Sequence, residues 1–387
     1  MKKMLRKAVA AVMALSMLLV LSACGGANYT AKNTEYVIGF SGPLTGPAAV
    51  YGTAVKNSAQ MAVDEINAAG GLNGVKFKLV AKDDTNDATK VAANYSSMLE
   101  EGMQVSLGTV TTAPGLEFTK LSAEDNVFFL TPSASGDDIP KNDNGYQMCF
   151  ADANQGAVAA DYVNSIGIKK IGIFYKSDDA YSNGIYKQFK SKLDKSIETV
   201  EAVFTGEAKD FSTQISTLKD CTFIFMPIYY EPATVFMTQA KDIIAKDAIY
   251  YGCDGFDGLA GQFEDFSVIP QEVSMLSHFD SKATEGAAAE FIKKYTEKFG
   301  ADTLNQFGAS AYDCVYAIYN AMKDAIDSGK EIDKTISASD LCDILKAEFK
   351  GGFTYSGVTG SNIKWQDNGY VTKTAIKYTL KTANSAK

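Results

Sequence analysis

Short apolar runs and longer amphipathic segments alternate along most of the chain. The apolar runs predict buried strands at 36–40, 77–80, 105–107, 127–130, 170–174, 200–204, 222–226 and 248–251. The segments between them carry apolar residues at helical spacing; Val55, Ala59, Val63 and Ile66, for example, would form one face of a helix. Because strands and helices alternate, we expect an α/β fold with parallel sheets that are covered by helices on both faces.

The last third of the chain departs from this alternation. Long amphipathic helices are expected at 285–299 and 310–326, and a shorter one at 341–349. Residues 353–381 return to a β-rich pattern with glycine-rich turns, and a terminal segment of this kind normally joins a sheet that is already formed. A chain of 387 residues exceeds what one hydrophobic core usually organises, so we expect two domains or lobes.

The first residues have the pattern of an export signal. Residues 1–7 are basic, and the apolar run at 8–21 is too short to span a bilayer. The tetrapeptide Leu-Ser-Ala-Cys that ends at Cys24 resembles a bacterial lipobox, which implies a signal peptide at 1–23 and a lipid on Cys24. The alternative is an ordinary secretory signal with a chance cysteine. Residues 24–34 are small and polar, which indicates a flexible tether.

Charge and composition exclude several classes of function. The net charge of −9 argues against nucleic acid or an anionic membrane surface as a partner. His278 is the one histidine, so a histidine base or a histidine-rich metal site would depend on it alone. Five cysteines follow Cys24 without any Cys-x-x-Cys pair, and buried free thiols are expected. We expect no metal and no cofactor.

Two predicted strands end in hydroxyl-rich turns. The strand at 105–107 leads to Thr112, where Ala-Pro follows as at many helix starts, and the strand at 127–130 leads to Ser133 and Ser135. Carboxyl ends of neighbouring parallel strands meet at one sheet edge. These hydroxyls and the free helix amides would form a neutral cup for a carboxylate. Alternatively, the hydroxyls only cap helices and turns; these residues alone do not decide.

An acidic turn at 83–87 also has two interpretations. Its carboxylates could hold a cation, although a carboxylate-rich helix start is the commoner cause of such a turn.

Several segments together resemble the Leu/Ile/Val-binding protein family, the branched-chain amino-acid type substrate-binding proteins of ABC importers. They are the run 36–46, Tyr51-Gly52, the block 62–74 and Asp83-Asp84. The resemblance implies two Rossmann-like lobes with parallel sheets joined by a three-segment hinge, the type I periplasmic-binding-protein fold. It implies a first lobe of 35–152 with 281–348 and a second lobe of 153–280 with 349–383.

The resemblance also implies a ligand site between the lobes. The carboxylate contacts fall on Thr112, Ser133 and Ser135, the ammonium contact on Asp254, and the aromatic walls on Tyr51, Tyr181 and Tyr229. A zwitterionic amino acid needs both hydrogen-bond donors and an anion, because burying either of its charges unpaired is costly. A ligand that bridges the lobes would favour the closed form.

The chain departs from the family pattern at four places. Thr112 stands where serine is commoner, and Asp254 is one methylene shorter than the usual glutamate. Asn86 and Thr111 occupy the places of a disulfide found in some members, and Tyr181-Ser-Asn-Gly replaces Tyr-Gly-x-Gly.

The expected function is therefore that of a lipid-anchored, extracytoplasmic binding protein. It would be a monomer that delivers an amino acid, branched-chain, other aliphatic or aromatic, to the permease of an ABC importer. Two alternatives stay open, a non-amino-acid ligand (an amide, urea or aromatic acid) and a ligand sensor. The acid at Asp254 favours an amino acid. An enzyme is disfavoured, because the cleft offers no nucleophile–base pair.

Overall fold

The computed structural model describes residues 29–373 and 375–383. The predicted signal peptide at 1–23, the predicted lipid attachment site Cys24 and the first part of the tether lie outside these residues. The described end of the tether forms a short 3-10 helix, η1 (Tyr29–Lys32). Within the described part, no helix is both long and apolar enough to cross a membrane.

The first lobe is built on a five-stranded sheet in the order β2-β1-β3-β4-β5, with every neighbouring pair parallel. Successive side chains of β1 point to opposite faces, so Ile38 and Phe40 pack in one apolar cluster and Val37 in another. Burial of both faces agrees with the continuous apolar runs in the sequence. The strands are β1 (Tyr36–Gly42), β2 (Phe77–Asp83), β3 (Val105–Ser106), β4 (Phe129–Thr131) and β5 (Gly145–Gln147).

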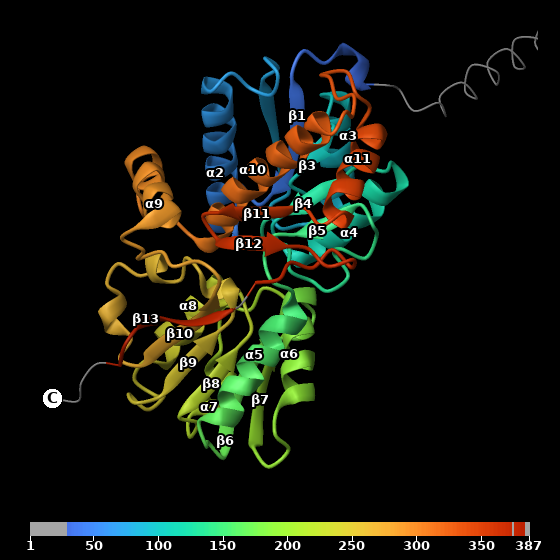
Figure 1. Cartoon of the computed structure of the whole chain (residues 1–387). Helices are drawn as coiled ribbons and strands as arrows, with labels where there is room; N and C mark the ends of the chain where they lie inside the picture. Colours follow the sequence, from blue (N-terminus) through green and yellow to red (C-terminus); the bar gives the residue numbers. More distant parts are fainter. Residues whose placement is uncertain (1–28, 374, 384–387) are drawn as a thin grey trace, which may run out of the picture.

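Helices cover both faces of this sheet (Figure 1). Helices α2, α10 and α11 supply buried side chains to the cluster around Ile38, whereas α3 and α4 supply those around Val37. Helix α9 packs beside α10 through Phe291 and Tyr295. The helices of this lobe are α2 (Ala49–Ala68), α3 (Val91–Glu100), α4 (Thr112–Glu124), α9 (Gly286–Phe299), α10 (Gln306–Asp327) and α11 (Ala338–Lys350).

The second lobe has a six-stranded sheet in the order β13-β10-β9-β8-β6-β7, in which only β13 runs antiparallel to its neighbour. Its strands are β6 (Lys170–Lys176), β7 (Glu198–Phe204), β8 (Phe223–Met226), β9 (Ile249–Gly252), β10 (Glu272–Ser277) and β13 (Ile376–Lys381). Its helices are α5 (Asp152–Ser165), α6 (Ala180–Lys192), α7 (Ser212–Leu218) and α8 (Tyr230–Ala240). Ile173 packs with α5 and α6, whereas its neighbour Phe174 packs with α7 and α8.

The hairpin of β11 (Thr354–Gly357) and β12 (Gly360–Lys364) lies against the first lobe. The hydroxyl of Tyr355 donates to Asp313 of α10 at 3.0 Å, and the indole of Trp365 donates to the carbonyl of Gln147 at 2.8 Å. The predicted boundary at 349 assigned this hairpin to the second lobe, whereas Tyr355 contacts α10 of the first lobe and Trp365, just after β12, packs on Phe349 of α11. Only β13 joins the second sheet.

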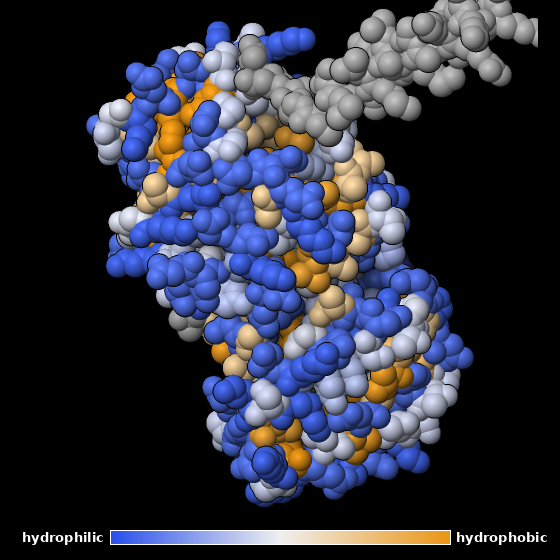
Figure 2. Space-filling view, turned by 90° about the vertical axis from the view of Figure 1, so that its right-hand side faces the viewer, coloured by the Kyte–Doolittle hydropathy of each residue, from blue (hydrophilic) through white to orange (hydrophobic). Residues whose placement is uncertain are grey.

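Three segments of chain cross between the two lobes, after β5, after β10 and before β13 (Figure 1). Two of the crossings meet where the rings of Phe150 and His278 lie 5.2 Å apart. His278 Nε2 lies 2.7 Å from the hydroxyl of Ser310, and burial lowers the pKa of His278 well below its usual range. The one histidine is thus a neutral residue of the hinge. On the face shown in Figure 2 the surface is mostly hydrophilic, with scattered hydrophobic residues.

The acidic turn at 83–87 is satisfied by local hydrogen bonds. Asp83 accepts from the amides of Leu44 and Thr85, each at 2.9 Å, and Asp87 caps the short helix η2 (Ala88–Lys90) through the Thr89 amide. Among the described residues, no group of three or more His, Cys, Asp or Glu side chains could hold a metal ion. Capping is therefore the better explanation of this turn.

The predicted buried free thiols are confirmed for the five described cysteines: Cys149, Cys221, Cys253, Cys314 and Cys342.

Candidate ligand-binding site

Strand ends from both sheets converge on one pocket between the lobes. The turns after β3 and β4 enter it from the first lobe, and those after β6, β8 and β9 enter it from the second. All the side chains that the sequence analysis proposed for the site line this pocket. Its lining residues are Tyr51, Val110, Thr111, Thr112, Ser133, Ser135, Tyr181, Tyr229, Asp254, Gly255 and Phe307.

The first lobe contributes the hydroxyl side of the pocket. Thr112 is the first residue of α4, and its hydroxyl is buried without a hydrogen-bond partner among the described residues. Thr111, at the N-cap position, makes no side-chain capping bond. Capping therefore does not account for either threonine hydroxyl. Buried polar groups in proteins are nearly always paired, so two unpaired hydroxyls beside a helix N-terminus are suited to an anionic ligand group.

The second lobe contributes an acid at the opposite side. Asp254 begins the short helix η3 (Asp254–Phe256) after β9 and is only 1% exposed. Its Oδ1 accepts from the hydroxyl of Tyr181 at 2.7 Å, and its amide donates to Gln155 at 2.9 Å. Its Oδ2 has no partner in the described part of the chain. Burial raises the pKa of Asp254 to about 7, and the hydrogen bond from Tyr181 opposes this shift.

Aromatic rings enclose the space between these two polar sides. Tyr181 stacks on Tyr229 with ring centroids 4.6 Å apart, and Tyr51 meets Tyr229 at 5.9 Å. Phe307 and Tyr230 each stand edge-on to Tyr51, at 5.0 and 4.9 Å. Such rings offer apolar walls and, in tyrosine, a polar end.

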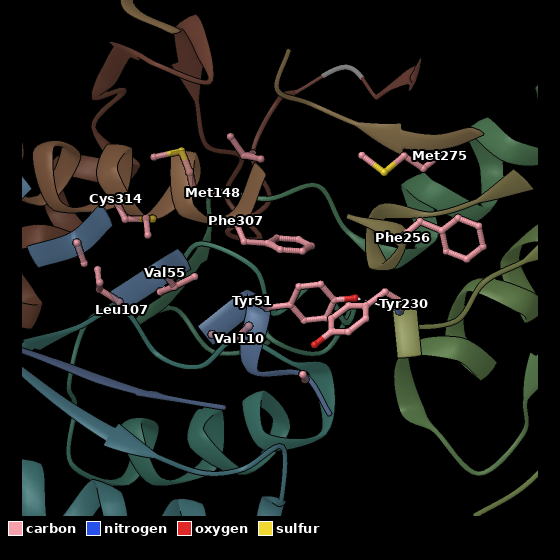
Figure 3. Close-up of a cluster of buried hydrophobic side chains, with 14 of the residues drawn as sticks. Tyr51, Val55, Leu107, Val110, Met148, Tyr230, Phe256, Met275, Phe307 and Cys314 are labelled. Atoms are coloured by element: carbon pink, nitrogen blue, oxygen red, sulfur yellow. Dashed lines mark hydrogen bonds between the residues drawn. The ribbon is translucent and has the colours of Figure 1, made fainter. Parts of the chain in front are cut away.

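The lobes also touch each other directly beside the pocket (Figure 3). The hydroxyl of Tyr51, from α2, donates to the carbonyl of Gly255 at 2.5 Å and accepts from the amide of Tyr230 at 3.3 Å. The amide of Gln306, in the first lobe, donates to Asp257 in the second at 2.8 Å. The structure is therefore a closed arrangement of the lobes.

The enclosed space is small in this arrangement. Its volume of about 10 Å³ is close to the least that holds one water molecule. A cavity of about 290 Å³ lies beside it, lined from both lobes, and Tyr229 borders both spaces. A ligand larger than water therefore reaches the polar groups only when the lobes or side chains move apart.

Four lining residues were not in the predicted site: Val110, Thr111, Gly255 and Phe307. Phe307 is the second residue of α10 and lies far along the chain from the other first-lobe residues, so its apolar side chain is typical of ordinary core. Val110, Thr111 and Gly255 lie within two residues of predicted site residues, and their position in a strand-end turn was the available signal.

Comparison with known proteins decides the family. Residues 35–383 match the family model described as periplasmic binding protein. This chain belongs to the periplasmic binding protein family. Its two parallel sheets and its hinge are those of the type I fold, and its role is binding rather than catalysis.

Curated relatives of this periplasmic binding protein include proteins named for the ligands they bind. The Leu/Ile/Val-binding protein BraC3 of Rhizobium johnstonii is 30% identical over 329 residues, 79% of this chain and 86% of that protein. A leucine-, isoleucine-, valine-, threonine- and alanine-binding protein of Pseudomonas aeruginosa is 29% identical over 61% of this chain and 64% of its own length.

Solved structures of ABC-transporter substrate-binding proteins are also similar to this chain. The branched-chain amino acid transporter substrate-binding protein LivJ of Streptococcus pneumoniae, in complex with isoleucine, matches with a TM-score of 0.79 and 26% identity over 90% of this chain and 97% of that one. A solute-binding protein of an R. palustris ABC transporter, in complex with benzoate, has a TM-score of 0.76 at 16% identity over 91% and 95% of the two chains, which shows the shared fold alone.

Proposed function

We propose that this protein is the substrate-binding subunit of an ABC importer and that it binds a free aliphatic amino acid, with branched-chain amino acids first. One observation carries the proposal. Unpaired hydroxyls on the first lobe and an unpaired carboxylate oxygen of Asp254 on the second face the same buried pocket in the described structure. Those are the groups that an amino acid's carboxylate and ammonium require.

Each predicted residue then has a definite role. Thr112, Ser133 and Ser135 would donate hydrogen bonds to the ligand carboxylate, and Asp254 would accept from its ammonium. Tyr51, Tyr181 and Tyr229 would enclose the apolar part of the ligand. Because donors and acceptor come from different lobes, the ligand stabilises the closed form by contacts that the open form lacks.

The names of relatives support the ligand class. The isoleucine complex of LivJ and the Leu/Ile/Val-binding protein BraC3 are both matched over most of this chain. By this proposal the protein works outside the cytoplasm, held to the membrane by a lipid on Cys24, and hands its ligand to membrane permease subunits.

A thermal-shift screen of the mature protein tests the ligand class. Leucine, isoleucine, valine and other L-amino acids are compared with urea, amides and benzoate. A ligand at 100 times its dissociation constant adds about 2.7 kcal/mol to the free energy of unfolding. We expect branched-chain amino acids to raise the melting temperature, and Asp254→Ala to abolish that rise because it removes the ammonium partner.

Asp220→Ala is the matched control, since Asp220 is exposed in the turn that follows α7 and does not line the pocket. It should keep the full ligand-induced shift. A response only to compounds that lack an ammonium group would overturn the amino-acid proposal and leave the fold and family unaffected.

A further inference from the structure

A second buried carboxylate lies next to the proposed ammonium site. Asp152 and Asp254 are each 1% exposed. Asp152 is the first residue of α5, immediately after the first crossing between the lobes. An acid in a first helical turn is ordinary when it is exposed, because the helix dipole favours it. The helix dipole does not explain why Asp152 is fully buried beside a second acid, Asp254.

Gln155 connects the two acids. Its Nε2 donates to Asp152 Oδ1 at 3.4 Å, and its Oε1 accepts from the amide of Asp254 at 2.9 Å. On its other side, Asp152 contacts the hydroxyl cup, because its amide donates to the carbonyl of Ser135 at 2.8 Å. Asp152 therefore joins the carboxylate side of the pocket to the ammonium side.

The groups around this pair do not balance its charge. Among the described residues that line the pocket there is no lysine, arginine or histidine. The other titratable groups that interact with the two carboxylates are acids, tyrosines and thiols, and they include Asp137, Asp179, Asp257, Tyr181, Tyr229, Cys149 and Cys253. Lys373, on the third crossing, acts on Cys149 and donates to Thr359 at 2.7 Å. Two unbalanced buried charges would be costly, and a group in such a site takes up a proton instead.

The direction of the pKa shifts agrees with this electrostatic argument. Burial, and after it the charge of Asp254, raises the pKa of Asp152 well above its usual range. Two neighbouring carboxylates titrate as a pair. Once one of them is ionised, the remaining proton is held much more tightly, because losing it would leave two like charges side by side. In the proposed complex, the ammonium would face Asp254 Oδ2, the buried oxygen that has no partner within the described residues.

We propose that Asp152 and Asp254 jointly retain a proton in the ligand-free protein, and that the ligand's ammonium displaces this proton to the solvent on binding. This inference rests on the proposed function. Asp254 would contact the ammonium, and Asp152 acts through it as a positioning residue. The ammonium keeps its own protons, so the release for each ligand bound rises to one proton as the pH falls below the pKa of about 7 at Asp254.

The sign of the pH dependence follows. The bound form needs the pair ionised, whereas the free form is protonated below the pKa of about 7 at Asp254. Affinity should therefore rise as the pH is raised through about 7, by up to roughly tenfold per pH unit where a full proton is exchanged.

Isothermal titration of the mature protein with L-leucine tests the proton exchange. The titration is run at pH 7 in phosphate and in imidazole, which differ in ionisation enthalpy. We expect the observed heat to depend on the buffer in proportion to a release of about half a proton, because a group with a pKa of about 7 is half protonated at pH 7. Asp152→Asn should bind L-leucine with a smaller release and a flatter affinity profile between pH 6 and pH 8. A residue that only supported the fold would weaken binding equally at every pH.

Asp254→Asn should lose most binding, and the exposed control Asp220→Asn should match the unmodified protein. If L-leucine binds without buffer-dependent heat, the proton exchange is wrong and the proposed function stands. If no amino acid binds, both are wrong. If Asp152→Asn fails to fold, the buffer dependence of the unmodified protein still decides the exchange. A release unchanged in a folded Asp152→Asn would overturn the role of Asp152.

Discussion

Two threonines of one helix show the difference between a hydroxyl that is available to a ligand and a hydroxyl that stabilises the fold. Thr112 and Thr119 both lie on α4, and both are 3% exposed. The hydroxyl of Thr119 donates to the carbonyl of Ile139 at 2.9 Å, whereas that of Thr112 has no partner in the described chain. A buried hydroxyl that contributes nothing to the fold is consistent with one kept for a ligand.

Replacement of each threonine by valine tests this difference. Thr112→Val should weaken L-leucine binding by roughly 10- to 150-fold, because a hydrogen bond to a charged group is worth about 1.5–3 kcal/mol. It should leave the unfolding free energy of the ligand-free protein nearly unchanged. Thr119→Val should lower that free energy by about 1–3 kcal/mol and leave affinity intact. Calorimetric titration and chemical denaturation measure the two quantities. The idea fails if Thr112→Val affects only stability.

Individual elements couple the lobes to each other. The N-terminus of α10, in the first lobe, is capped by Asn305 through the Gly308 amide at 2.9 Å. Asp257 of the second lobe accepts from another free amide of this first turn, that of Gln306, at 2.8 Å. Burial raises the pKa of Asp257 to about 6. One helix start is thus satisfied from both lobes, and opening would break one of these bonds.

Asp257→Ala should therefore favour the open form. Loss of the bond across the lobes would weaken L-leucine binding by roughly 5- to 150-fold, mainly through faster dissociation, because such a bond contributes about 1–3 kcal/mol to closure. Small-angle scattering should show a larger radius of gyration for the ligand-free variant. Asp265→Ala is the control, because Asp265 caps only η5 (Phe266–Val268) within the second lobe. An unchanged dissociation rate in Asp257→Ala would show that this cap does not control closure.

At the scale of the whole molecule, the two hinged lobes bind the ligand, and the N-terminal segment before them is predicted to attach the protein to the membrane. The described residues contain no helix that could cross a membrane, and the basic and apolar segments before them, with a tetrapeptide that resembles a lipobox, predict an exported lipoprotein. Attachment through one lipid at Cys24 would leave the hinge free to open and close at the membrane surface.

Cys24→Ser tests the attachment in a bacterial host that processes lipoproteins. The unmodified protein should stay with the membrane fraction and incorporate labelled fatty acid, and the variant should lose the label. Cys221→Ser, which changes a buried thiol of the second lobe, should behave like the unmodified protein. Fatty acid incorporation that persists in Cys24→Ser would place the lipid elsewhere.

The fold class could be predicted because it depends on local signals, whereas the seven proposed contacts were implied by the family resemblance and all line one pocket. Parallel strands buried on both faces appear as continuous apolar runs, and their strand-end turns carry the polar groups. Strands β5 and β10 were not predicted, because Gly145–Gln147 and Glu272–Ser277 carry no continuous apolar run and are defined by pairing with distant strands. The antiparallel direction of β13 and the docking of the β11–β12 hairpin on the first lobe are likewise long-range.

The sequence by itself determined the alternation of strands and helices, the polar turns, and the family. Tertiary structure alone decided which of those polar groups lack partners and which acids become neighbours. Asp152 and Asp254 lie about a hundred residues apart in the chain, and Gln155 joins them only after the first crossing and β9 are brought together. Charge interaction depends on separation in space and on burial, and periodicity along the chain contains neither.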